Sequence, residues 1–206
     1  SVKNDGNVPD SFDLTWDTSG LPASWSTDAA DGSTDYLNMN VAYPGSVVLT
    51  IPAGEAAATS AAFTLTVTST EGTWSGTADF SASVAQFYNL TLDVAANEMT
   101  AEPANAADFS FTVTNTGNGD DTYTIAVETL ATTYNPTAPP DTGAVAADGS
   151  TQFVLGTTVP AGSPAHASSG NITITVTSSD EWAIATATVS VATSTRYQLI
   201  RAPVVR

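Results

Sequence analysis

The sequence predicts an all-β protein made of tandem β-sandwich domains, and three observations support this prediction. The chain of 206 residues repeats itself at an interval of about 109 residues. Within each repeat, apolar residues alternate with Thr, Ser and Asp in short runs, which is the pattern of strands buried on one face only. Gly, Pro and Asn, which favour turns, separate the runs. An interval of this length is typical of one immunoglobulin-like sandwich.

The repeat consists of four blocks that recur in the same order at offsets of 108 to 111 residues. The matched blocks are 2–14 with 113–125, 51–54 with 159–162, 63–69 with 172–178, and 88–90 with 197–199. We therefore expect a first sandwich at 1–86 that lacks its first strands and a complete sandwich at 87–195. Residues 196–206 are expected to be the first strand of a next repeat or a strand donated to another copy.

The strands follow from the alternation of apolar and polar residues. In the second repeat they are expected at 87–94, 108–115, 122–130, 151–155, 171–178 and 182–192. In the first repeat, three apolar faces are expected, formed by Phe12, Leu14 and Trp16, by Val47, Leu49 and Ile51, and by Phe63, Leu65 and Val67. A Pro-rich loop at 135–141 cannot be a central strand, and no stretch shows a helical period. Two sheets packed face to face are expected.

The charge of the chain excludes two classes of partner. Twenty-one acidic and four basic residues give a net charge of −17. Nucleic acids and anionic lipid headgroups are bound through Lys and Arg, so neither partner is expected. The absence of Cys excludes disulfides and thiolate zinc sites, and the sequence has no apolar run of ~18 residues that could span a membrane. We expect an extracellular protein at a cell surface.

Three of the blocks carry a resemblance to known surface modules. They are FSFTVTNTGNGDDTYTI at 109–125, VPAG at 159–162 and ITITVTSS at 172–179. With these blocks the chain resembles the immunoglobulin-like modules of the CARDB and NEW3 kind, which occur in tandem on archaeal and bacterial surface proteins. The resemblance implies the sandwich fold, and it implies a role as a spacer, an adhesion unit or an envelope component.

The sequence does not predict an enzyme. His166 is the only histidine, and it lies among serines that it could serve as a base. A catalytic triad also needs an orienting acid and an oxyanion hole, which nothing near His166 in the sequence supplies. No spacing among the many Asp and Glu residues marks out a pair for glycoside hydrolysis. We expect no catalytic residues and no cofactor other than calcium.

Calcium is considered because acidic residues cluster at turns. Asp28, Asp31 and Asp35 surround a glycine turn, and acidic turns also occur at 4–10 and 117–121. Calcium takes six to eight oxygen ligands from such loops, although acidic loops are usually only solvated and the EF-hand pattern is absent. Asp28, Asp31 and Asp35 are the candidate ligands.

Two further kinds of surface site are candidates. Asn89 and Asn171 begin Asn-x-Thr sequons, and alternation turns both side chains outward, as a glycan requires. The tryptophans are Trp16, Trp25, Trp74 and Trp182. We expect most of them in a core or an interface, and a carbohydrate-stacking platform is the alternative.

Two classes of function follow from these observations. The favoured one is a structural repeat module of a stalk, filament or surface layer, whose partners are other copies or neighbouring repeats. The alternative is an adhesion or carbohydrate-binding module, with or without a dependence on calcium, whose candidate loop is the insertion at 25–37. Under strand donation, the assembly strand comprises Tyr197, Leu199, Ile200, Val204 and Val205, flanked by Arg196, Arg201 and Arg206. The plain alternative is that the sequence is cut from a longer array.

Overall fold

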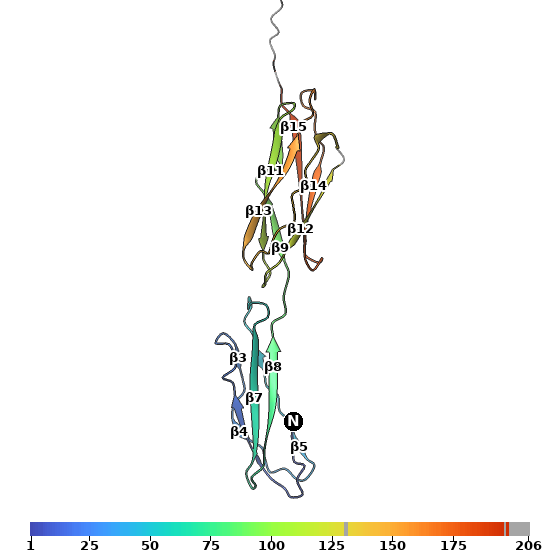
Figure 1. The fold of residues 1–206 in the computed structure, drawn as a ribbon. Coiled ribbons are helices and arrows are strands. Elements are labelled where there is room, and N and C mark those ends of the chain that lie inside the picture. Colours follow the sequence, from blue (N-terminus) through green and yellow to red (C-terminus); the bar gives the residue numbers. More distant parts are fainter. Residues whose placement is uncertain (130–131, 196, 198–206) are drawn as a thin grey trace, which may run out of the picture. The chain divides into compact units, whose positions relative to one another are not determined.

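A computed structural model describes residues 1–129, 132–195 and 197 of the chain. The chain divides into two compact units, Ser1–Gln86 and Phe87–Arg206 (Figure 1). The regular structure of the described residues is β-strand, apart from one short 3-10 turn at Thr132–Tyr134. The predicted all-β fold is therefore confirmed. Leu130 and most of the predicted C-terminal strand lie outside the described residues.

The second unit is a sandwich of a three-stranded and a four-stranded sheet (Figure 1). The first sheet has the order β13-β11-β9, with β9 at Leu90–Val94, β11 at Ala106–Asn115 and β13 at Ser150–Thr158. The second has the order β10-β15-β14-β12, with β10 at Glu98–Ala101, β12 at Tyr123–Thr129, β14 at Ile172–Ser178 and β15 at Ile184–Thr193. The predicted strands of this repeat thus form two sheets.

One strand of this unit differs from the expected pattern. β10 pairs in parallel with β15, from Glu98↔Ser190 to Ala101↔Thr193, whereas the other strand pairs are antiparallel. The sequence of β10 is only EMTA, which is too short to show a period of two. This segment is a strand because it pairs with the edge of β15, whose residues lie about 90 positions later in the sequence. The sequence of the segment itself therefore does not indicate a strand.

The core of the second unit is made by the inner faces of both sheets. β11 and β14 alternate strictly between buried and more exposed residues, as the sequence predicts. Phe109, Phe111, Leu155, Ile174 and Val176 are at most 1% exposed. Burying such a side chain contributes about 1.5–3 kcal/mol, so these residues dominate the stability of the unit.

The first unit has one full sheet and only fragments of the second. The full sheet has the order β4-β2-β7-β8, with β2 at Phe12–Asp17, β4 at Gly32–Ser33, β7 at Ser60–Ser69 and β8 at Ser75–Ser83. The fragments are two pairs of two-residue strands, β1 at Val2–Lys3 with β5 at Ala42–Tyr43, and β3 at Ser26–Thr27 with β6 at Leu49–Thr50. At the repeat offsets, β2, β7 and β8 correspond to β12, β14 and β15.

A buried asparagine closes the same turn in both units. Asn4 and Asn115 each donate from Nδ2 to two backbone carbonyls and accept a backbone N–H at Oδ1. The partners are Val8 (3.0 Å), Leu37 (2.9 Å) and Gly6 (2.9 Å) for Asn4, and Gly119 (2.8 Å), Val145 (2.8 Å) and Gly117 (2.9 Å) for Asn115. The amide satisfies backbone groups that the turn would otherwise leave unpaired.

An aspartate fastens the same hairpin in both units. Ser69 Oγ donates to the Asp10 carboxylate at 2.5 Å, and Ser178 Oγ donates to the Asp121 carboxylate at 2.6 Å. Ser179 adds a second hydroxyl bond to Asp121 at 2.7 Å. The acidic turns at 4–10 and 117–121, which the sequence suggests as calcium loops, therefore also have a structural role. Their carboxylates bind serines at the ends of β7 and β14, far away in the sequence.

Candidate functional site

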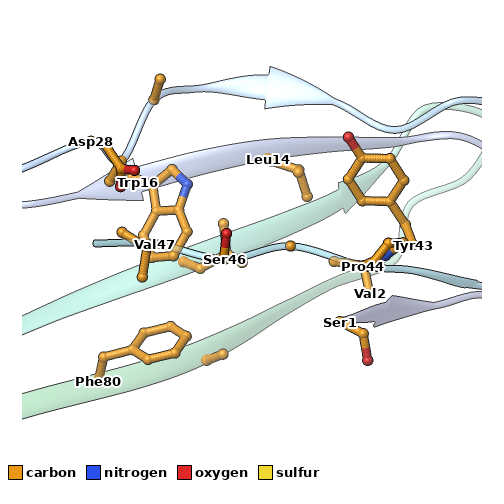
Figure 2. Close-up of a pocket in the computed structure, with 15 residues that line it drawn as sticks. Ser1, Val2, Leu14, Trp16, Asp28, Tyr43, Pro44, Ser46, Val47 and Phe80 are labelled. Carbon is orange, nitrogen blue, oxygen red and sulfur yellow. The ribbon is translucent and has the colours of Figure 1, made fainter. Parts of the chain in front are cut away.

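An open groove in the first unit is the strongest candidate site. It has a volume of about 500 Å³ and lies between the inner face of the four-stranded sheet and the chain at 43–47 (Figure 2). The sheet contributes mainly apolar side chains. The lining includes Leu14, Trp16, Leu65, Ala78 and Phe80 on the sheet, and Val2, Tyr43, Gly45 and Val47 opposite them.

The floor of the groove is aromatic. Trp16 lies 5.6 Å from Phe80 and 6.0 Å from Phe63 between ring centroids, and Phe63 stacks on Phe80 at 5.2 Å. Phe63 is buried, but Phe80 is 37% exposed. An aromatic side chain on the inner face of a sandwich normally lies in the core, so the exposure of Phe80 shows that the core of this unit is uncovered at the groove.

The groove lies where β11 packs in the second unit. At the repeat offset of 111, Val2 corresponds to Val113, so the places of Phe109 and Phe111 have no counterpart within residues 1–206. The β11–β13 ladder runs over nine pairs, from Ala106↔Thr158 to Thr114↔Ser150. The β1–β5 ladder has only two pairs, Val2↔Tyr43 and Lys3↔Ala42. The groove thus lies beside the short β1–β5 ladder, whose Val2 and Tyr43 line it.

The wall opposite the sheet has smaller side chains than the corresponding wall of the second unit. At the offset of 108, Gly45 corresponds to Phe153 and Val47 to Leu155, both buried in the second unit. A Cβ atom at Gly45 would meet no other atom within 4 Å. The sheet of the first unit carries the larger side chains instead. Trp16 and Phe80 stand at the positions that the aliphatic Val127 and Val189 occupy in the second unit.

The surroundings of the groove are strongly acidic. Residues 1–86 contain ten acidic residues and a single basic one, Lys3, for a net charge of −9. Lys3 forms an ion pair with Asp5, and Asp28 lies at the edge of the groove. A net charge of this size favours the approach of cations over anions at low ionic strength.

The candidate calcium ligands are not gathered by the fold. Asp28 Oδ1 accepts the N–H of Val48 at 2.6 Å, and Asp31 Oδ1 accepts the N–H of Trp16 at 2.7 Å. Asp35 is exposed. In the described part of the chain, no group of three or more His, Asp or Glu residues is placed to hold a metal ion. Calcium binding by Asp28, Asp31 and Asp35 stays a prediction.

The other predicted site residues lie at the surface. Asn89 and Asn171 are both exposed, so the structure leaves room for a glycan on each, and their modification stays a prediction. Tyr197 is 94% exposed, and Leu199, Ile200, Val204 and Val205 lie outside the described residues. No helix of the described residues is long and apolar enough to cross a membrane.

His166 is exposed on a loop, where Thr195 Oγ1 lies 3.3 Å from its Nε2 and its backbone has a φ of 65°. The contact between Thr195 and the ring joins two side chains at the surface and brings no carboxylate to the histidine. The absence of enzymatic activity stays a prediction.

The tryptophans divide between core and surface. Trp25 is buried and Trp16 is half-buried in the groove, whereas Trp74 and Trp182 are 61% and 90% exposed. Trp74 and Trp182 lie at corresponding hairpins, the turns that follow β7 and β14. Trp25 is thus a core residue, as predicted for most of the tryptophans, and a place in an interface stays a prediction for Trp74 and Trp182.

The groove itself was not predicted as a site. Its signal in the sequence is the pair of large aromatic residues at 16 and 80, where repeat two has valines. This signal appears only after the two repeats have been aligned.

No protein-family model matches the chain, and no curated protein matches it. The chain is similar to a solved protein of unknown function from Porphyromonas gingivalis W83, at 13% identity and a TM-score of 0.35, over 94% of this chain and 88% of that one. It is also similar to domains 4 and 5 of the S-layer protein SbsC (13%, TM-score 0.34, 91% and 100% covered). The third is BcpA, the major pilin subunit of Bacillus cereus (9%, TM-score 0.35, 90% and 65% covered).

Likeness at these identities and TM-scores carries no inference about activity, and the all-β assignment rests on the sheets of the chain itself. The resemblance to CARDB and NEW3 modules likewise stays a prediction.

Proposed function

We propose that the chain is a structural repeat module of an extracellular stalk, filament or surface layer, whose copies or neighbouring repeats join head to tail by strand complementation. The observation that supports this proposal is the open groove of the first unit, where Phe80 is 37% exposed and the β1–β5 ladder is only two pairs long, because exposed core side chains and an unpaired backbone edge invite the pairing of a further strand. Both are satisfied when a strand from elsewhere is added to the sheet.

The repeated architecture supports a mechanical role. Both units have a buried asparagine that closes a turn and an aspartate that binds a serine at the end of a strand. These hydrogen bonds join residues that are far apart in the sequence, and they recur in both units. Contacts of this kind rigidify a domain when every member is satisfied. A contact between unlike surfaces of identical copies propagates into a fibre unless its rotation closes a ring.

The test is the assembly of the purified chain. We expect sedimentation velocity to show mass increasing with protein concentration, and negative-stain images to show filaments or chains of beads. A chain that remains monomeric at every concentration and salt condition would contradict assembly by this segment.

A second candidate function is an adhesion or carbohydrate-binding module. Trp16, Phe80 and Tyr43 place aromatic rings in one groove, and sugars bind by stacking on such rings. A glycan array probed with the labelled chain, with and without calcium, tests this function. Specific binding that is lost in Trp16→Ala, with an unchanged melting temperature, would favour adhesion over a purely structural role.

A further inference from the structure

We propose that the groove of the first unit binds the C-terminal segment of a second copy as a β-strand, with Ile200, Ala202 and Val204 facing the groove. The inference rests on the proposed head-to-tail assembly and names its donor, its register and the face that is buried. Three properties of the groove and of the segment carry it: the place of the missing strand, the direction of its backbone hydrogen bonds, and charge.

The place of the donor follows from the second unit. There, β11 runs antiparallel to β13 and places Ala107 and Phe109 opposite Thr157 and Leu155. At the offset of 108, these partners correspond to Leu49 and Val47 of the first unit. A donor in this place would set Val204 opposite Val47 and Ala202 opposite Leu49, and it would end before reaching Ser1 and Val2.

The hydrogen-bonding edges of β11 decide which donor residues need an N–H. The carbonyl of Ser110, whose side chain is exposed, accepts from Ala95 N at 3.0 Å, on the side of β9. Successive residues of a strand direct their backbone groups to opposite neighbours. The buried residues Phe109 and Phe111 therefore bond to β13, and in the groove the inward-facing donor residues bond to the chain at 45–49.

The sequence of the segment fits one face only. With Ile200, Ala202 and Val204 inward, Pro203 directs its missing N–H to the open edge, where a strand tolerates proline. Arg201 then faces solvent. With Leu199, Arg201 and Pro203 inward, the ladder would lose a hydrogen bond at Pro203 and a guanidinium would enter an apolar groove, which is costly without a partner.

The fit of size and charge points the same way. Trp16 and Phe80 already fill part of the space that β11 fills in the second unit, so an Ile, an Ala and a Val suit the groove better than two phenylalanines. Ala202 would take the place of Ala107, which is buried. Arg206, next on that face, reaches the open end beside Gly45, where its stem can pass to solvent.

Charge complementarity selects this chain's own tail. The segment 196–206 contains three of the four basic residues of the protein and no acidic residue. The first unit carries a net charge of −9. The attraction between them is long-ranged and weakens with salt, so assembly through this contact should weaken as the ionic strength rises.

The test compares two double variants of the full chain. Ile200→Asp with Val204→Asp places carboxylates on the proposed inner face, and Leu199→Asp with Val205→Asp places the same charges on the outer face. We expect the first to weaken self-association at least tenfold more than the second, as measured by sedimentation velocity. Equal loss in both variants, or greater loss in the outer-face variant, would overturn the register.

The groove side is tested with its own matched pair. Ala78→Phe fills the groove from β8, whereas Thr77→Phe adds the same ring to the opposite face of that strand. We expect only Ala78→Phe to abolish association, with both variants retaining the melting temperature of the parent chain within a few degrees. Association that survives in Ala78→Phe would show that the donor binds elsewhere and overturn the inference.

A disulfide test needs no stable mutant core, because the chain has no Cys. A chain with Val47→Cys is mixed with one carrying Val204→Cys or, as control, Val205→Cys, and oxidised mildly. We expect the mixed disulfide with Val204→Cys to form in clear excess. A better yield with Val205→Cys would contradict the buried face.

The failures of the two proposals are distinguishable. If the full chain does not self-associate, the assembly proposal fails, and a labelled peptide of residues 197–206 is then titrated into the same chain. Binding that is lost in Ala78→Phe would support the donor site alone, and no binding would overturn it. If the full chain assembles but the groove and inner-face variants assemble equally, the structural role stands and the donor strand is wrong.

Discussion

Ser178 Oγ donates a hydrogen bond of 2.6 Å to the Asp121 carboxylate, which is 3% exposed. Burial raises the pKa of the Asp121 carboxyl, but the hydrogen bonds from Ser178, Ser179 and the backbone of Ser179 and Thr122 outweigh it and hold the pKa below its usual value of 3.8. Burial, followed by the charge of Asp121, raises the pKa of Tyr123 far above its usual range. The carboxylate is therefore ionised in the folded protein.

Asp121→Asn should destabilise the second unit by about 1.5–3 kcal/mol, since hydrogen bonds to a charged acceptor are worth about that much. Urea unfolding followed by near-ultraviolet circular dichroism measures the change. Asp108→Asn, on the exposed face of β11, serves as the control and should change stability little. Equal effects in both variants would show that the bond to Ser178 contributes nothing.

The stability that the Asp121 carboxylate contributes to the second unit should be lost in acid. The folded pKa of Asp121 lies below that of the unfolded chain, so its contribution is full above the unfolded value near 3.8 and is lost as pH falls through the folded pKa. We expect the difference in unfolding free energy between the parent and Asp121→Asn to shrink as pH falls below about 4. A difference independent of pH between 7 and 3 would contradict this linkage.

Asn115→Ala should be strongly destabilising. The substitution leaves the carbonyls of Gly119 and Val145 and the N–H of Gly117 without their partner, at about 1–3 kcal/mol for each group that finds no water. Asn115→Asp retains the acceptor for Gly117 but loses both donors, so it should recover only part of the loss. Recovery of full stability by Asp would show that the two carbonyls do not need the amide.

Calcium at Asp28, Asp31 and Asp35 is tested by thermal melting. An ion that binds only the folded chain stabilises it by mass action, so calcium should raise the melting temperature and a chelator should lower it. Asp35→Asn should remove the calcium effect, and magnesium serves as the control for screening of the net charge. The same melting temperature with calcium, magnesium and chelator at matched ionic strength would exclude the site.

The sequence by itself determined the fold class and most of the strands of the second unit. The alternation over 171–178 became β14 at Ile172–Ser178, and 108–115 became β11 at Ala106–Asn115. These predictions depend on a period of two along a strand with one buried face, a property that each segment carries locally. The 109-residue repeat added the correspondence between strands, which no single segment contains.

Only the tertiary structure decided which contacts the acidic turns make and where the first unit is open. Asp10 and Asp121 look like solvated or calcium-binding residues in sequence, because their serine partners are 59 and 57 residues away. β10 exists only as the parallel partner of β15. The groove is likewise a property of two walls, from 14–16, 65 and 78–80 on one side and 43–47 on the other. Such features arise when segments that are distant in the sequence come together. The alternation of apolar and polar residues along one strand shows which face is buried, but it does not show which segment packs against that face.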